Sequence, residues 1–140
     1  MLDTNIYISY LLIPPGKSTI NTLVDAALMG AFVLLIAPEL LEELRRKVVL
    51  KPYLARRIAP GDVEALVSAL LEVGEMIPKI EDAIPEVGRD RKDDYLIAYA
   101  LVGQADFLVS GDRDLAALKE IEGLKIVSPA ESVMLLGQEL

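Results

Sequence analysis

The stretch Ala105-Asp106-Phe107-Leu108-Val109-Ser110-Gly111-Asp112-Arg113-Asp114 decides the fold class, because an apolar run leads directly into two closely spaced aspartates. A short apolar run of this kind, bounded by polar residues, predicts a buried strand. Met1-Leu2 leads into Asp3-Thr4-Asn5 in the same way. In an open parallel sheet, ligands bind outside the carboxyl ends of the strands. Carboxylates at two such ends therefore predict a site for a hard cation.

Outward from this stretch, short apolar runs alternate with patterns of helical period. The apolar runs predict strands at residues 32–36, 107–110 and 124–128, with a weaker one at 76–77. The helical patterns cover residues 19–29, 38–49, 61–73 and 91–102, with shorter ones at 115–119 and 130–136. This alternation predicts an α/β fold with a mainly parallel sheet. The loops around Gly16, Pro52 and Pro60 mark no domain boundary, so we expect one domain over residues 1–140.

Two residue types are missing from the chain, and this narrows its chemistry. The sequence of 140 residues has no cysteine and no histidine. Disulfides, thiolate zinc sites, cysteine nucleophiles and histidine acid–base catalysis are therefore excluded. Any metal must be held by oxygen atoms, which favours Mg²⁺, Mn²⁺ or Ca²⁺.

The composition, 53% hydrophobic and 26% charged, is that of a globular protein. No apolar run reaches the roughly 18–20 residues that cross a bilayer, and no secretory signal is visible. We therefore expect a soluble, cytoplasmic protein with no membrane partner. A net charge of −8 argues weakly against a nucleic-acid partner, although basic side chains cluster within residues 45–47 and 89–92.

The helix predicted at residues 38–49 carries three glutamates at different angles to its apolar stripe. At roughly 100° per residue, Glu39 and Glu42 lie about 145–155° from the centre of the stripe, which predicts full exposure. Glu43 lies about 115° away, at the edge of the stripe, where it could reach a cleft. The alternative is a solvated Glu43 that pairs with Lys47 at i+4.

The helix predicted at residues 91–102 places an acid on its apolar face. Asp93 falls within roughly 10–20° of the centre of the buried stripe, whereas Asp94 lies about 100° away. Burial of an unpaired carboxylate is costly, so a buried aspartate is usually hydrogen-bonded, paired or bound to a metal. The alternative is that Asp93 accepts backbone N–H bonds in the first turn of the helix.

The aspartates at the strand ends also have two interpretations. Asp112 or Asp114 could cap the short helix that follows, and Asp3 could serve a turn. Several carboxylates at element ends in a chain without histidine nevertheless favour a metal site. Carboxylates a few ångströms apart repel one another strongly unless a cation neutralises them. One or two Mg²⁺ or Mn²⁺ ions would neutralise such a cluster and would support phosphodiester cleavage.

Four stretches together resemble the PIN domain in order and spacing, most closely the prokaryotic PIN-family toxins of toxin–antitoxin systems. They are Leu2-Asp3-Thr4-Asn5-Ile6, Glu39-Leu40-Leu41-Glu42-Glu43-Leu44, Asp93-Asp94-Tyr95-Leu96-Ile97-Ala98-Tyr99-Ala100-Leu101, and residues 105–115 around Ser110-Gly111-Asp112. The resemblance implies a three-layer α/β/α PIN-like fold with a central, mainly parallel sheet of four to five strands. It also implies Mg²⁺- or Mn²⁺-dependent endoribonuclease activity.

The resemblance further assigns roles to individual residues. The implied catalytic acids are Asp3, Glu43, Asp93 and Asp112, and the implied metal ligands are Asp3, Asp93, Asp112 and Asp114. Asn5 and Ser110 match small polar positions that line the site, and we expect Arg113 to contact RNA phosphate. An antitoxin protein and a homodimer are further expectations from the family.

Two other functions stay open. A PIN-like module could bind RNA or a protein without cutting RNA. A phosphotransfer domain is weaker, because the second aspartate that phosphohydrolases need two residues after the nucleophile is Asn5 here.

Overall fold

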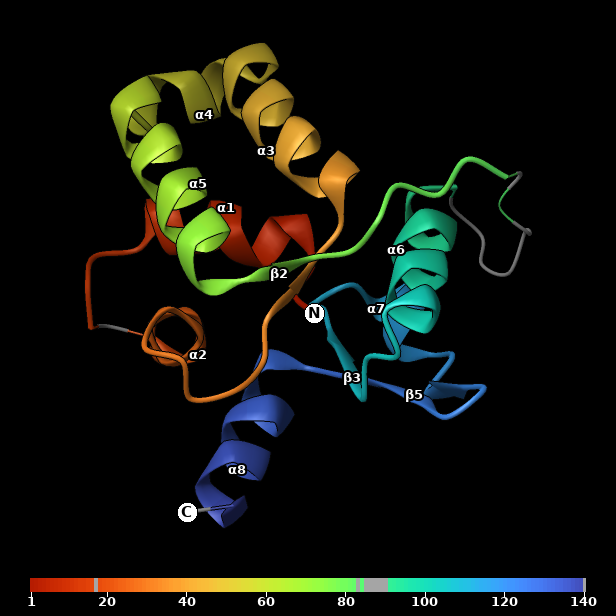
Figure 1. Cartoon of the computed structure of the whole chain (residues 1–140). Coiled ribbons are helices and arrows are strands. Elements are labelled where there is room, and N and C mark those ends of the chain that lie inside the picture. The colour runs from red at the N-terminus through yellow and green to blue at the C-terminus, as the bar shows by residue number, and fades with distance from the viewer. Residues whose placement is uncertain (17, 83, 85–90, 140) are drawn as a thin grey trace.

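The computed structural model describes residues 1–16, 18–82, 84 and 91–139, with the side chains of residues 91–93, 138 and 139 outside the description. The helices are α1 (Thr4–Leu12), α2 (Thr19–Leu28), α3 (Pro38–Leu50), α4 (Pro52–Arg57), α5 (Pro60–Val73), α6 (Arg91–Val102), α7 (Arg113–Ala116) and α8 (Pro129–Glu139). The strands are β1 (Leu35–Ile36), β2 (Glu75–Met76), β3 (Phe107–Val109), β4 (Glu120–Ile121) and β5 (Leu124–Val127). Helices and strands mix along the chain, which confirms the α/β class (Figure 1). None of the described helices is both long and apolar enough to span a membrane.

The described strands form two small sheets, and a single central sheet of four to five strands is not seen. β1 pairs with β2 in parallel, whereas β3 pairs with β5 in parallel and β4 joins β5 antiparallel. Leu2 makes an isolated parallel bridge to Val109 next to β3. Because Leu2 contributes one bridge only, it extends the β3 sheet by a single residue and does not join it to β1.

Most of the predicted helices are confirmed, and two local predictions are wrong. The apolar run at residues 32–36 forms a strand only at Leu35–Ile36, and Val33 is exposed. Residues 52–57 form helix α4 instead of a loop. Pro52 occupies the first turn of α4 after an extended Lys51, a position where its missing N–H costs nothing.

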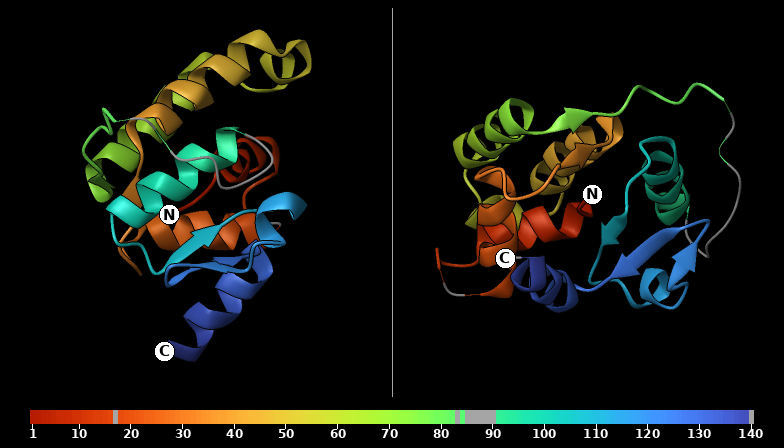
Figure 2. Two further views of the ribbon diagram at one scale, coloured as in Figure 1. Left: turned by 90° about the vertical axis from the view of Figure 1, so that its right-hand side faces the viewer. Right: turned by 60° about the horizontal axis from the view of Figure 1, so that its bottom comes forward.

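The elements that carry the acids converge through the packing of α1. This helix contacts both α2 and α3, and its buried side chains Ile6 and Tyr7 belong to the hydrophobic core. α6 contacts β3, and α8 lies against α2 (Figure 2). The start of α1, the middle of α3 and the end of β3 are thereby brought to one region of the molecule.

Gly74 connects α5 to β2 and leaves no room for a side chain, so we expect Gly74→Ala to destabilise the fold. An added Cβ would overlap Ile36 Cδ1 and would lie 2.8 Å from the carbonyl oxygen of Leu70. Overpacking of this kind costs about 1–3 kcal/mol, which lowers the melting temperature by roughly 3–10 °C. Thermal unfolding followed by circular dichroism measures the change. Gly61→Ala is the control, because nothing lies within 4 Å of its added Cβ, and equal melting temperatures for the two variants would contradict the prediction.

Candidate active site

Hydrogen bonds connect Asp3, at the end of the first three residues, to Val109 and Ser110 at the end of β3. The amide of Asp3 donates to the carbonyl oxygen of Val109 at 3.0 Å, which continues the strand-like pairing of Leu2. Ser110 Oγ donates to Asp3 Oδ2 at 2.8 Å and accepts from the amide of Asp112 at 3.0 Å. Asp3 and Ser110 are both buried. The two chain segments therefore meet through the Ser110 hydroxyl, which links the Asp3 carboxylate to the backbone of Asp112 and not to the Asp112 carboxylate.

Glu43 reaches the same region from α3. The residue is 6% exposed, so it is buried at the edge of the apolar stripe of α3. Thr4 Oγ1 donates to Glu43 Oε2 at 3.1 Å, and the Tyr95 hydroxyl donates to the same oxygen. Lys47 Nζ lies 3.0 Å from Glu43 Oε1. The i+4 pair with Lys47 is therefore present as well, although it is partly buried, with 13% of the Lys47 side chain exposed.

The two carboxylates have opposite electrostatic environments. Burial raises the pKa of Asp3, and the nearby charge of Glu43 raises it further, while the hydrogen bond from Ser110 opposes both. Burial also pushes the pKa of Glu43 upward, but the hydrogen bonds from Tyr95 and Lys47 and the charge of Lys47 outweigh it, so the pKa is lowered. Glu43 is thus held ionised by its partners, whereas the charge of Asp3 is poorly compensated.

Two glutamate–tyrosine pairs connect α3 to α6. Tyr95 bonds to Glu43, and Tyr99, one turn later in α6, interacts through its hydroxyl with Glu39, one turn earlier in α3. The tyrosine rings pack edge to face with their centroids 6.4 Å apart. Glu39 is half-buried, and within the described part of the chain its Oε2 atom is buried without a hydrogen-bond partner. The prediction of a fully exposed Glu39 is therefore wrong, because α6 covers that flank of α3.

The third acid of the predicted set lies at the start of α6. The side chain of Asp93 is outside the described residues, so its predicted burial stays a prediction. Asp94 is 5% exposed, although the helical angles place it away from the apolar stripe of α6. Asp94 is therefore an alternative to Asp93 as the third acid of the site. It directly precedes Tyr95, which is bonded to Glu43.

Of the two aspartates that follow β3, Asp112 and Asp114, the first caps helix α7. Asp112 is the N-cap of α7, and its side chain accepts from the amide of Asp114 at 2.8 Å. Asp112 is half-buried, whereas Arg113 and Asp114 are exposed. Among the described residues, no group of three acids lies close enough to hold a metal ion. The oxygen donors that do converge, the carboxylates of Asp3 and Glu43, have the chemistry that suits Mg²⁺ or Mn²⁺.

Three residues of this site, Thr4, Lys47 and Tyr95, are not part of the predicted set. Lys47 has a sequence signal, its i+4 spacing from Glu43, but the pattern is equally typical of an exposed pair. Thr4 and Tyr95 follow Asp3 and Asp94 directly, and nothing else in the sequence distinguishes them. Asn5 is exposed and accepts from Lys47 Nζ at 3.4 Å, and its role in lining the site stays a prediction.

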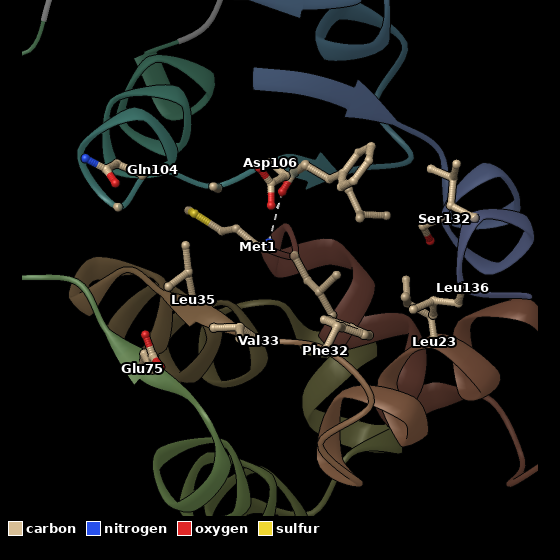
Figure 3. Close-up of a pocket in the computed structure, with 16 residues that line it drawn as sticks. Met1, Leu23, Phe32, Val33, Leu35, Glu75, Gln104, Asp106, Ser132 and Leu136 are labelled. Carbon is tan, nitrogen blue, oxygen red and sulfur yellow. Dashed lines mark hydrogen bonds between the residues drawn. The ribbon is translucent and has the colours of Figure 1, made fainter. Parts of the chain in front are cut away.

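A separate cavity of about 390 Å³ lies between the two sheets (Figure 3). Met1 and Phe107 line it on the β3 side, and Leu35 lines it on the β1 side. The α-ammonium group of Met1 donates to the carbonyl oxygen of Phe107 at 3.0 Å, and burial lowers its pKa to about 6 despite the charge of Asp106. Neither Asp3 nor Glu43 lines this cavity. We therefore place the candidate chemistry at the buried carboxylates and not in the cavity.

Comparison with known families identifies the domain. A family model described as PIN domain matches residues 1–114, which includes Asp3, Glu43 and the segment after β3. No curated protein matches the chain. The chain therefore belongs to the PIN-domain family, whose members are generally nucleases.

Proposed function

We propose that the protein is a metal-dependent endoribonuclease. The observation that carries the proposal is the burial of two carboxylates, Asp3 and Glu43, which come from separate elements and repel each other across one site. Glu43 is compensated by Lys47, but burial of the Asp3 carboxylate beside it is unfavourable unless a cation or a proton compensates Asp3 as well. The family match supports a nuclease in general, and the choice of RNA rests on the resemblance of the four sequence stretches.

Asp3 would be the first metal ligand, with Asp112 and Asp114 contributing from the start of α7. The remaining ligand would come from the start of α6, either from Asp93, as the resemblance implies, or from the buried Asp94. A bound Mg²⁺ or Mn²⁺ supplies charge neutralisation and Lewis acidity for phosphodiester hydrolysis.

The chain's own residues would position these groups and bind the substrate. Ser110 orients the Asp3 carboxylate through its hydroxyl, and Thr4 and Tyr95 fix the orientation of Glu43. Arg113 is exposed beside Asp112 and would contact the RNA phosphate. Each of these contacts restricts a side chain before substrate arrives, which is what positioning in a catalytic site requires.

The biological role we propose is that of a toxin in a cytoplasmic toxin–antitoxin pair. It rests on the resemblance alone, together with the expected homodimer and the antitoxin partner. Co-purification of the protein with the product of a neighbouring small gene would support the role. Growth that continues normally when the protein is expressed without that product would contradict it.

A non-catalytic module that binds RNA or protein is the second candidate. It is favoured by the capping role of the Asp112 carboxylate and by the lack of a three-acid group among the described side chains. Titration calorimetry with Mn²⁺ separates the candidates, since a module that binds RNA without metal should give no binding heat.

Removal of divalent metal should abolish RNA cleavage. The purified protein is incubated with end-labelled RNA in Mn²⁺, in EDTA, and in EDTA followed by excess Mn²⁺, and products are resolved on denaturing gels. We expect cleavage to fall at least about 100-fold in EDTA, because several kcal/mol of charge stabilisation is lost, and to return with Mn²⁺. Cleavage that persists in EDTA would exclude the metal-dependent reaction.

A further inference from the structure

The second half of α3, helix α4 and the start of α5 form a strongly basic segment in an acidic chain. Residues 44–61 hold six of the 14 basic side chains and none of the 22 acidic ones, although the whole chain has a net charge of −8. Figure 1 shows α4 directly after α3. Four cations of this segment are exposed, and we name them the α3–α4 elbow: Arg46, Lys51, Arg56 and Arg57.

The cations of the elbow have no acidic partners that neutralise them. The other two basic residues of the segment are paired, Arg45 with Glu64 at 2.8 Å and Lys47 with Glu43 at 3.0 Å. Among the described residues, none of the four elbow cations forms an ion pair. Like charges that gather on a surface repel one another, and the dipole of α4 disfavours Lys51 at the start of that helix. The elbow therefore costs stability, which indicates an anionic partner.

The elbow is continuous with the candidate active site along α3. At roughly 100° per residue, Arg46 and Leu50 lie about 60° and 20° from Glu43 around the helix, so they continue the face that carries Glu43. At about 1.5 Å per residue, Lys51 lies about 12 Å further along the axis than Glu43. A few nucleotides of a single strand span this distance, at about 3.4 Å each. A strand bound along this face therefore extends to the buried carboxylates.

Exposed apolar side chains lie among these cations. Leu50 is 67% exposed and Tyr53 is 57% exposed. Tyr53, Arg56 and Arg57 are spaced i, i+3 and i+4, so they share one face of α4. A basic surface with an exposed aromatic ring is typical of proteins that bind single-stranded nucleic acid, because the ring stacks on an unpaired base. An anionic membrane fits less well, because Leu54, on the apolar face of α4, is already buried in the core.

We propose that the α3–α4 elbow binds single-stranded RNA, with its four cations on phosphates and Tyr53 stacked on an unpaired base. The choice of RNA rests on the proposed function, but binding at the elbow requires no metal ion. Phosphate contacts carry no information on base sequence. The elbow therefore holds the strand in place next to the site and does not select its sequence.

Fluorescence anisotropy in EDTA tests the proposal without cleavage, with a labelled single-stranded RNA of about 12 nucleotides as the probe. Arg56→Gln combined with Arg57→Gln should reduce the slope of log affinity against log salt concentration by about 1.4, because each phosphate contact contributes about 0.7. Lys119→Gln combined with Lys125→Gln is the matched control. Both lysines are exposed, and Lys125 begins β5 at the end of the sheet away from Ser110, so the slope should not change.

Substitutions of Tyr53 separate stacking from charge. Tyr53→Ala should weaken RNA binding at least about fivefold without a change in the salt slope, whereas Tyr53→Phe keeps the ring and should bind like the wild type. Circular dichroism verifies that each variant is folded. In Mn²⁺, the double variant of Arg56 and Arg57 should raise the KM for RNA cleavage and keep kcat within about twofold of the wild type.

The possible outcomes separate the role of the elbow from the nuclease proposal. No RNA binding by the wild type in EDTA, or an unchanged salt slope in the double variant of Arg56 and Arg57, would overturn the role of the elbow. Tighter binding to duplex RNA of the same sequence, or to phosphatidylserine vesicles, would overturn it in favour of another partner. RNA binding through the elbow without cleavage in Mn²⁺ would support the elbow and contradict the nuclease proposal alone.

Discussion

Asp3→Asn is expected to lower RNA cleavage at least about 100-fold and, at the same time, to raise the melting temperature of the metal-free protein. Activity falls because a neutral amide is a much poorer ligand for Mg²⁺ or Mn²⁺ than a carboxylate, and each tenfold loss corresponds to only about 1.4 kcal/mol. Stability rises because the Asp3 carboxylate is buried beside Glu43 without a bonded cation. The amide oxygen of Asn can still accept the hydrogen bond from Ser110.

The direction of the pH dependence follows from the raised pKa of Asp3. The folded protein holds the Asp3 proton more tightly than the unfolded chain does, so the free energy of unfolding decreases as pH rises from the unfolded pKa through the folded one. Asp3→Asn removes the titrating carboxyl group, and with it this decrease in the free energy of unfolding. Its advantage in melting temperature should be smallest near pH 4 and should grow as the pH rises to 7.

The comparison requires metal-free protein, measured with EDTA between pH 4 and pH 7. Asp82→Asn is a suitable control, because Asp82 is exposed and removal of its charge should change neither activity nor the pH profile. An Asp3→Asn protein that cleaves RNA as fast as the wild type would remove Asp3 from the site. A melting temperature below that of the wild type at pH 7 would show that the carboxylate is already compensated.

The second large effect concerns the two aspartates at the start of α6. Asp94→Asn should reduce cleavage at least about 100-fold, whereas Asp93→Asn should reduce it less than about tenfold. We base this order on the burial of Asp94, which is 5% exposed and directly precedes the tyrosine that bonds to Glu43. A buried carboxylate is usually retained for a ligand or a partner.

Rates and metal affinity should be measured for both variants under the same conditions, with circular dichroism to verify folding. The double variant tells whether the two positions act independently. If Asp93→Asn is the more damaging change, the assignment made from the resemblance holds and the burial of Asp94 is structural. Equal, wild-type cleavage by both variants would place the third ligand outside α6.

The burial of a site residue could be predicted from the sequence where its own helix or strand alone determines which way the side chain faces. The edge position of Glu43 on its own helix allows a buried glutamate and an i+4 pair with Lys47, and the structure has both. The same geometry fails for Glu39, which interacts with Tyr99 of α6, and for Asp94, which is buried although its helical angle points away from the apolar stripe. Burial of these residues depends on tertiary packing, and periodicity within one helix carries no information on that packing.

Strand pairing shows a similar limit. The apolar run before Ser110 predicts β3, and the convergence of strand ends predicts that the residues after Leu2 and after β3 lie in one region. The division into two sheets could not be predicted, because it depends on how many backbone hydrogen bonds Leu2 makes with its neighbours. The sequence also could not decide whether Asp112 caps α7 or binds a metal. Both roles require an aspartate at this position.

The hydrogen bond between Ser110 and Asp3 joins residues 107 positions apart, and the bond between Tyr95 and Glu43 spans 52 positions. Contacts this distant in sequence form only after long loops have closed, which slows folding. A chain emerging from the ribosome exposes Asp3 and Thr4 first but lacks the serine that orients the carboxylate until residue 110 has been added. The acids of the site are therefore dispersed through most of translation, and they meet only when nearly the whole domain has been synthesised.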